Sequence, residues 1–224
     1  MIGIGAKGRA CGRAVAVAVV LGLAALVAHP AESLAAGNVD LVAAKAQPRG
    51  SVYLFLGLLN VFSTGLDTLA DQLHARGVPA VAMNYAGWTG PAAEIEARYA
   101  RNSASARPIV IVGHSFGADA ALSMSAELAR KQIPVDLVVI FDATAQQPVP
   151  ANVRHLINFY SPTDGVGKRL APGRGFHGRF ENINIDKLGK GIGHLDIEKQ
   201  PAFHSRVIRE VLALYGRGAR VSSN

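Results

Sequence analysis

The sequence has a single cysteine, Cys11, among its 224 residues, and this cysteine lies near the N-terminus. An intrachain disulfide framework is therefore excluded, because a bridge needs two cysteines. Charged residues are also scarce, at 17%, whereas hydrophobic residues make up 50% of the chain. This balance excludes a disordered chain and is typical of one domain with a buried core.

Motifs for metals, nucleotides and nucleic acids are absent as well. The chain has no H-x-x-E-H or H-E-x-x-H pattern, no P-loop and no dinucleotide fingerprint, so we expect no metal and no cofactor. The net charge is +7, but the basic residues are not interleaved with aromatic ones, so we expect no nucleic-acid partner. The one basic cluster, in the loop 168–179, is a candidate for contact with a membrane surface or an anionic substrate; a solvated loop is the simpler alternative.

The N-terminal segment lacks a hydrophobic run of membrane-spanning length. The uncharged stretch from Ala14 to Ala28 is shorter than the ~20 residues that a transmembrane helix needs. A basic stretch between Lys7 and Arg13 precedes it, and the small residues Ser33 and Ala35 follow it. This pattern predicts a signal peptide over residues 1–36, with an uncleaved N-terminal anchor as the alternative. In either case we expect an exported domain, periplasmic or secreted.

Short apolar runs alternate with helix-like segments in the rest of the chain. The run 51–57 is almost continuously apolar, as in a strand that is buried on both faces of a parallel sheet. The alternation predicts an α/β fold with a mostly parallel sheet of about six strands, helices on both faces and no separate lid. We expect strands at 51–57, 78–84, 109–112, 137–141, 156–160 and 180–185, and helices at 66–76, 92–101, 118–131 and 202–215. The expected boundaries are a lead-in over 37–50, the domain over 51–216 and a tail over 217–224.

The pentapeptide Gly113-His114-Ser115-Phe116-Gly117 stands between an expected strand and an expected helix. In that position, G-x-S-x-G is the pattern of a nucleophile elbow. Glycines are needed because the turn is so tight that side chains there would collide with neighbouring backbone. The serine hydroxyl is then presented at the tip, with the positive end of the helix behind it. The alternative is an ordinary glycine-rich turn in which Ser115 caps the helix.

On this pentapeptide, and on the first strand with the loop behind it, the chain resembles the α/β-hydrolase superfamily, particularly its compact lipase-like and thioesterase-like members. The resemblance covers about residues 51–215. It implies a serine hydrolase whose functional residues follow the order serine, acid, histidine. The brief connections after Asp142 and Tyr160 depart from the family pattern, which usually has a cap or a helix there.

The resemblance implies a catalytic histidine between the last strand and the last helix, where the chain has His194. The glycines before it would let the imidazole reach over the strand ends, although a surface-loop histidine is the alternative. Two residues remain as the acid. Asp142 ends one strand, whereas Asp164 follows the next strand in a Pro-Thr-Asp-Gly turn. We favour Asp142, because an abrupt strand end fixes a side chain more firmly than a turn does. His114, at the variable elbow position, is expected to pack below the serine.

Two backbone N–H groups are needed to hold the oxyanion of an acyl-transfer reaction. The resemblance implies that the backbone N–H of Phe116 is the first of these donors. It implies that the second donor is a backbone N–H in the loop after the first strand, for which we favour Leu58, with Leu59 next. The same leucines predict an apolar acyl pocket, the alternative being that they belong to the core. Tyr85 and Trp88 are candidates for a second, substrate-binding wall, although lone aromatic residues near a strand end more often pack.

Together these residues predict an exported serine hydrolase that cleaves a carboxylic ester, of a lipid or a small molecule, or a thioester through an acyl-enzyme. Ser115 would attack, His194 would carry the proton and Asp142 would orient His194. Two alternatives remain open. One is a non-catalytic protein of the same fold that binds a lipid or a cell-envelope partner, and the other is an acyltransferase.

Overall fold

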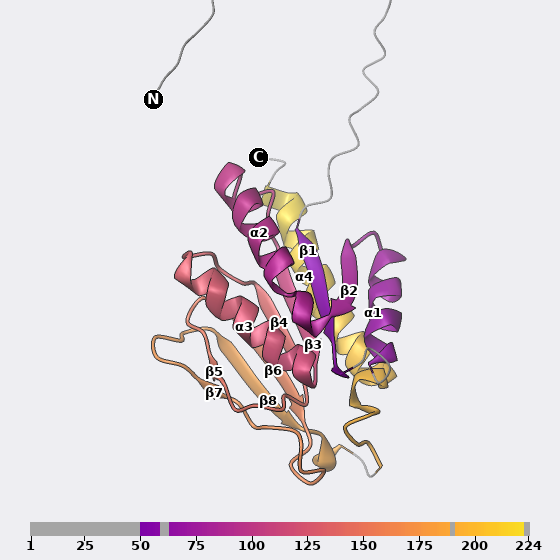
Figure 1. Ribbon diagram of the computed structural model, residues 1–224. Helices are drawn as coiled ribbons and strands as arrows, with labels where there is room; N and C mark the ends of the chain where they lie inside the picture. The colour runs from indigo at the N-terminus through magenta and orange to yellow at the C-terminus, as the bar shows by residue number, and fades with distance from the viewer. Residues whose placement is uncertain (1–49, 59–62, 189–190, 222–224) are drawn as a thin grey trace, which may run out of the picture. The chain divides into compact units, whose positions relative to one another are not determined.

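The computed structural model describes residues 50–58, 63–188 and 191–221, and all structural statements below concern these residues. Within them the expected fold class is confirmed: six strands form one sheet in the order β2-β1-β3-β4-β6-β8, and all neighbouring pairs are parallel (Figure 1). The strands of this sheet are β1 (Ser51–Leu56), β2 (Ala80–Asn84), β3 (Ile109–His114), β4 (Leu137–Phe141), β6 (His155–Tyr160) and β8 (Arg179–Asn184).

Helices cover both faces of the sheet. On one face lie α1 (Thr64–His74) and α4 (Pro201–Val221), and on the other α2 (Thr89–Arg101) and α3 (Phe116–Arg130) (Figure 1). Successive side chains of a strand point to opposite faces. In β1, accordingly, Leu54 packs in the core with α1 and α4, whereas Phe55 packs in the core with α2 and α3. Burial on both sides explains why the strands β1, β3 and β4 read as nearly continuous apolar runs.

Some element boundaries differ from those expected from the sequence. Helix α4 continues to Val221, although a tail was expected from residue 217, because glycine weakens a helix by only about 1 kcal/mol per residue and does not block it. Helix α2 begins at Thr89 rather than at residue 92, since Pro91 lies in its first turn, where a missing N–H costs no intrahelical bond.

A small parallel pair was not expected at all. It joins β5 (Pro148–Val149) and β7 (Ala171–Pro172). Two-residue strands that contain proline have no alternating pattern, so no sequence signal marks them.

The expected signal peptide and most of the lead-in lie outside the described residues. Within the described part of the chain, no helix is both long enough and apolar enough to span a membrane.

Candidate active site

The parallel register brings several polar residues to one edge of the sheet. Gly113 of β3 pairs with Phe55 of β1, and His114 pairs with Phe141 of β4. Because parallel strands end on the same side, Ser115, which follows β3, and Asp142, which follows β4, emerge next to each other. The loop before α4 brings His194 to the same edge, which is where ligands bind in open α/β sheets.

Ser115 lies in a strained turn between β3 and α3. Its backbone has φ 58° and ψ −125°, a conformation that non-glycine residues rarely adopt. The N–H of Ser115 donates to the carbonyl of Phe141 at 3.0 Å, which holds the turn against β4. A Cβ atom on Gly113 would overlap the backbone of Gly117, and one on Gly117 would overlap the backbone of Phe55. Both glycines are thus required by close backbone approach.

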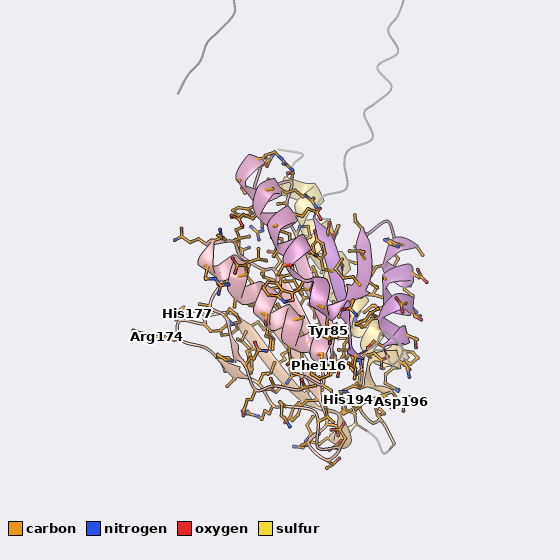
Figure 2. The ribbon with its side chains drawn as sticks, viewed as in Figure 1. Tyr85, Phe116, Arg174, His177, His194 and Asp196 are labelled. Atoms are coloured by element: carbon orange, nitrogen blue, oxygen red, sulfur yellow. The ribbon has the colours of Figure 1, made fainter. Side chains whose placement is uncertain are left out.

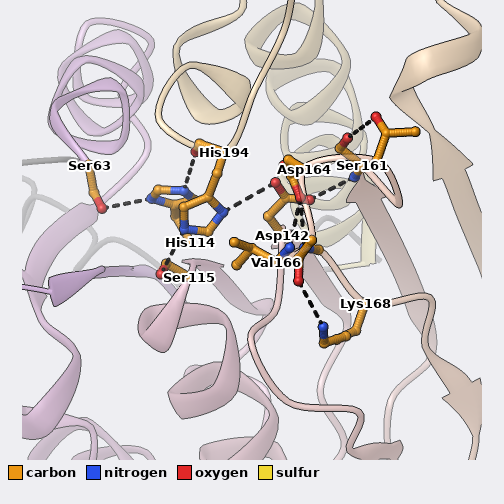
Figure 3. Close-up of polar contacts among 12 residues, drawn as sticks. Ser63, His114, Ser115, Asp142, Ser161, Asp164, Val166, Lys168 and His194 are labelled. Atoms are coloured by element: carbon orange, nitrogen blue, oxygen red, sulfur yellow. Dashed lines mark hydrogen bonds and ion pairs between the residues drawn. The ribbon is translucent and has the colours of Figure 1, made fainter.

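Ser115, His194 and Asp142 form a chain of hydrogen bonds (Figure 3). The Nε2 atom of His194 lies 3.0 Å from Oγ of Ser115, and its Nδ1 atom lies 3.2 Å from Oδ2 of Asp142. A carboxylate only accepts, so Nδ1 carries the proton and Nε2 is free to accept from the serine hydroxyl. The arrangement gives the serine a base and gives the base an orienting carboxylate.

Asp142 is fully buried, and Ser161 N–H donates to its second oxygen at 2.8 Å. Burial raises the pKa of Asp142 above its usual value, while hydrogen bonds from His194 and Ser161 act in the opposite direction and the carboxyl of Asp164 adds to the rise. Each carboxylate oxygen of Asp142 thus has a hydrogen-bond donor, Ser161 N–H for Oδ1 and His194 Nδ1 for Oδ2, and the two bonds hold the carboxylate in one orientation.

Asp164, the alternative acid, has a different role in the structure. Its Oδ1 accepts from Val166 N–H at 2.9 Å and from Gly167 N–H at 3.2 Å, which closes a turn. Partial burial acts to raise the pKa of Asp164, but these hydrogen bonds hold it below its usual value. One ligand atom each of Asp142, Asp164 and His194 lie within 4.8 Å of one another. This is a spacing that could accept a cation, but Asp142 and His194 are already bonded to each other.

A pocket of about 320 Å³ opens beside Ser115. Three of the large hydrophobic side chains with the greatest exposure line it: Leu58 is 45% exposed, Phe116 42% and Leu195 48%. When an apolar group covers such side chains, the complex is stabilised by roughly 25 cal/mol per Å² of apolar surface removed from water. The other lining residues are Gly57, Ser63, His114, Ser115, Thr144, Val166 and His194.

The two expected oxyanion donors both belong to this pocket. Phe116 is the first residue of α3, where N–H groups have no intrahelical acceptor. Leu58 follows the end of β1 and also lines the pocket. Leu59, the second choice, lies outside the described residues.

Tyr85 and Trp88, the aromatic residues expected to form a second wall of the pocket, lie in different surroundings. Tyr85 stacks on the pocket residue Phe116 with ring centroids 5.6 Å apart, but it is not itself among the residues that line the pocket. Trp88 does not line this pocket. It borders a separate hollow between α2 and α3, with Ala92 and Leu128, and packs against the core there. Substrate binding by Trp88 therefore stays a prediction, and the structure places its side chain at the contact of α2 with α3.

Sequence reasoning missed several pocket residues, namely Ser63, Thr144, Val166 and Leu195. All four come from connections rather than from strands, and no motif marks such positions. In the basic loop 168–179, Arg174 and His177 lie at the left of the view, whereas His194 lies at the lower right (Figure 2). The first residue of the loop is closer to the pocket, since the N–H of Lys168 donates to the carbonyl of Ala143, next to the pocket residue Thr144.

No protein-family model and no curated protein sequence matches the chain. Solved structures that are similar to this chain include an esterase from Pyrobaculum calidifontis. Its sequence identity is 10% and its TM-score is 0.46, and the alignment covers 75% of this chain and 78% of the esterase. The esterase domain of a Rhodothermus marinus protein has 18% identity and a TM-score of 0.44, with 78% and 88% covered. The type II thioesterase of the borrelidin biosynthetic cluster has 15% identity and a TM-score of 0.47, with 74% and 94% covered.

Proposed function

We propose that this protein is a serine hydrolase that cleaves carboxylic esters with an apolar acyl group. One observation carries the proposal: the hydrogen-bonded chain of Ser115, His194 and Asp142 ends at an apolar pocket. A buried serine that merely capped a helix would not need a base on its hydroxyl, nor a carboxylate behind that base.

The chemistry follows from the contacts. Oγ of Ser115 attacks the ester carbonyl carbon while its proton moves to Nε2 of His194, and Asp142 stabilises the imidazolium that forms. The N–H groups of Phe116 and Leu58 hold the negative oxygen of the tetrahedral intermediate. Collapse of the intermediate releases the alcohol, which takes the proton from His194. Water then repeats the sequence on the acyl-enzyme, releasing the carboxylic acid and restoring Ser115.

The size of the pocket indicates the class of acyl group. At about 320 Å³, its volume lies at the small end of the range of ~300–1,000 Å³ that is typical of ligand sites. The lining by Leu58, Phe116, Val166 and Leu195 favours a hydrocarbon over a charged group. We therefore propose short to medium acyl chains as the preferred substrates.

A series of p-nitrophenyl esters, from acetate to palmitate, tests the proposal on the purified protein. We expect kcat/KM to rise with the first added methylenes and to fall for the longest chains, which exceed the pocket. Absence of turnover for the whole series, together with saturable binding of the fatty acids, would support a non-catalytic lipid-binding protein instead. Transfer of the acyl group to an added alcohol in preference to water would identify an acyltransferase.

We further propose that the protein is exported, on the basic, apolar and small-residue pattern of residues 1–36. Intact-mass measurement on protein from its native host tests this. A mass that begins near Ala36 supports a cleaved signal peptide, and a mass that retains Met1 supports the anchor. Contact of the loop 168–179 with an anionic membrane surface is part of the same proposal, and vesicle sedimentation with and without anionic lipid tests it.

A further inference from the structure

A second chain of hydrogen bonds runs beneath Ser115 (Figure 3). The N–H of Gly57 donates to Oγ of Ser63 at 2.7 Å, and Oγ of Ser63 lies 2.8 Å from Nδ1 of His114. The other ring nitrogen of His114, Nε2, lies 2.8 Å from the backbone carbonyl of His194. The chain thus links the end of β1, the start of α1, the elbow and the loop that holds the base.

The carbonyl of His194 fixes which group donates and which accepts in each of these hydrogen bonds. A carbonyl oxygen only accepts, so Nε2 of His114 must carry the proton that faces His194. In the neutral ring, Nδ1 then has a free lone pair, which accepts from the hydroxyl of Ser63. Ser63 in turn accepts from Gly57. All the polar atoms of the two side chains are therefore used.

These groups are shielded from water. Ser63 is 0% exposed and His114 is 1% exposed. Burial lowers the pKa of His114 to about 4, and the neighbouring His194 ring, whose centroid is 4.8 Å away, acts in the same direction. His114 therefore stays neutral near pH 7 and cannot serve as a second base. Because the ring remains uncharged, its bond to the His194 carbonyl does not change as His194 gains and loses a proton.

In the described part of the loop that holds His194, few hydrogen bonds fix the backbone. Gly191 has φ +92°, and a Cβ on Gly191 or on Gly193 would meet nothing within 4 Å. The local hydrogen bonds, from the N–H groups of Asp196 and Ile197 to the carbonyl of Gly193, close the turn behind the histidine. At residue 194 itself, the backbone hydrogen bond observed in the described chain is the one from His114.

We propose that His114 is a positioning residue for the catalytic base, and that Ser63 sets the tautomer in which it acts. The second residue of the elbow fixes the backbone of His194, so that the same pentapeptide which presents the nucleophile also places the base. The assignment rests on the proposed function, since it gives His194 its role as a base.

Substitution of His114 tests the role in catalysis. His114→Leu removes both hydrogen bonds, whereas His114→Gln keeps a donor for the carbonyl and an acceptor for Ser63. Because displacement of a catalytic group by about 1 Å can cost roughly 100-fold, we expect His114→Leu to lower kcat by about 10- to 100-fold with KM nearly unchanged, and His114→Gln to restore most of the loss. A kcat for His114→Leu within twofold of the parent overturns the proposal.

A matched control separates positioning from general loss of packing. Ser125 is also a fully buried serine, and its hydroxyl donates to the carbonyl of Ala121 within α3, away from the pocket. Ser125→Ala should lower the unfolding midpoint while leaving kcat unchanged. An equal fall in kcat for Ser125→Ala and Ser63→Ala would mean that any buried defect slows the reaction, which overturns the specific role.

NMR on protein labelled with ¹⁵N-histidine tests the same contacts without any substrate. We expect His114 to show the Nε2–H tautomer at neutral pH and to gain a second proton with a pKa of about 4. We also expect the Nδ1 proton of His194, bonded to Asp142, to be protected from exchange in the parent and in His114→Gln but not in His114→Leu. An Nδ1–H tautomer for His114, or full protection in His114→Leu, overturns the proposal even if no ester substrate is found; failure of ester turnover with these signals intact would overturn only the proposed function.

Discussion

The two edges of the sheet both have a hollow, and the larger hollow is not the candidate active site. At the amino edge, a cavity of about 530 Å³ is lined by residues that precede or begin strands, such as Ser51 and Pro79, and by charged residues of α2. At the carboxyl edge, the pocket beside Ser115 has about 320 Å³. Volume alone would therefore select the wrong edge.

The two edges differ in the hydrogen bonds and ion pairs that their polar side chains make. At the amino edge, Arg98 donates to Ser51 Oγ at 3.1 Å and to the Ser105 carbonyl at 3.2 Å, and it lies 3.5 Å from Glu94. These contacts fasten the strand ends to each other. At the carboxyl edge, the hydrogen-bonded chain instead ends at Ser115, whose hydroxyl borders the pocket. A functional site is recognised by a reactive group at the end of its network.

The largest expected effect is at the carboxyl edge. Ser115→Ala removes the attacking oxygen, and we expect it to lower kcat for ester hydrolysis by about 10⁶, a loss typical of a serine nucleophile. Thermal unfolding should remain within a few degrees of the parent, because the backbone of the elbow is unchanged. Hydrolysis at the parental rate by the purified variant would remove Ser115 from the mechanism.

The second effect compares the two carboxylates. Asp142→Asn leaves the imidazole of His194 free to take the wrong tautomer, which lowers kcat by roughly 10⁴ in other triads. Asp164→Asn keeps the side-chain oxygen that closes its turn, so we expect kcat within about threefold of the parent. Steady-state kinetics on both variants checks the ranking, and the reverse order would move the acid to Asp164.

The third effect concerns the apolar lining. Leu195→Asp places a charge beside the acyl group, and loss of one apolar contact in a pocket costs roughly 10- to 200-fold in discrimination. We expect kcat/KM for a medium-chain ester to fall by about 10- to 100-fold. Leu212→Asp, at another exposed leucine, in α4 (38% exposed), is the control and should have little effect. Equal losses for the two variants would argue against an acyl-binding role.

The fourth effect is on stability and belongs to the amino edge. The Asp136 side chain is 4% exposed, pairs with Arg107 and Arg154, and accepts from Ile109 N–H at 2.9 Å. Asp136→Ala leaves that N–H buried without an acceptor, so we expect the free energy of unfolding to fall by about 1–3 kcal/mol. Urea denaturation measures it. The half-exposed pair of Glu96 and Lys131 gives the control, since Glu96→Ala should cost less than about 1 kcal/mol. Activity per folded molecule should be unchanged in both.

The last effect is a pH dependence of stability at Glu198, in the short helix that follows the loop of His194. Burial raises the pKa of Glu198 from 4.5 to about 7, although the N–H of Gly65 opposes the rise. The neutral acid is therefore favoured by folding, and its contribution to stability is present below about pH 4.5 and is lost as the pH rises through 7. Glu198→Gln has no such loss. Urea midpoints should agree near pH 5 and favour the variant near pH 8; a constant difference would mean that Glu198 does not titrate in this range.

Much of this arrangement could be predicted from the sequence, because local patterns determine it. The apolar runs before Gly113 and Asp142 place both residues at strand ends, and the glycines around Ser115 are required by backbone contacts that the elbow pattern implies. Asp142 was favoured over Asp164 because the apolar run ends abruptly before it. In the structure, Asp142 has a positive φ of 48°, so the chain does turn sharply where β4 ends. These features depend on a few neighbouring residues.

The rest depends on contacts between distant segments, and local patterns do not contain those. Ser63 meets His114 across 51 positions of the chain, and His114 meets His194 across 80. Trp88 turned away from the pocket because of how α2 packs on α3, which no single-segment pattern specifies. The sequence predicted only that His114 packs below Ser115. The structure shows that His114 also forms hydrogen bonds with Ser63 and with the backbone of His194.

The central claim is that the carboxyl edge holds one activated serine, and labelling with a fluorophosphonate tests it most directly. The probe forms a covalent bond to an activated serine oxygen, and peptide mass mapping locates it. We expect a single adduct on Ser115, none on Ser115→Ala, and much slower labelling of His194→Ala, with no adduct at the amino edge. An unlabelled parent protein, or equal labelling of the parent and Ser115→Ala, would contradict the claim.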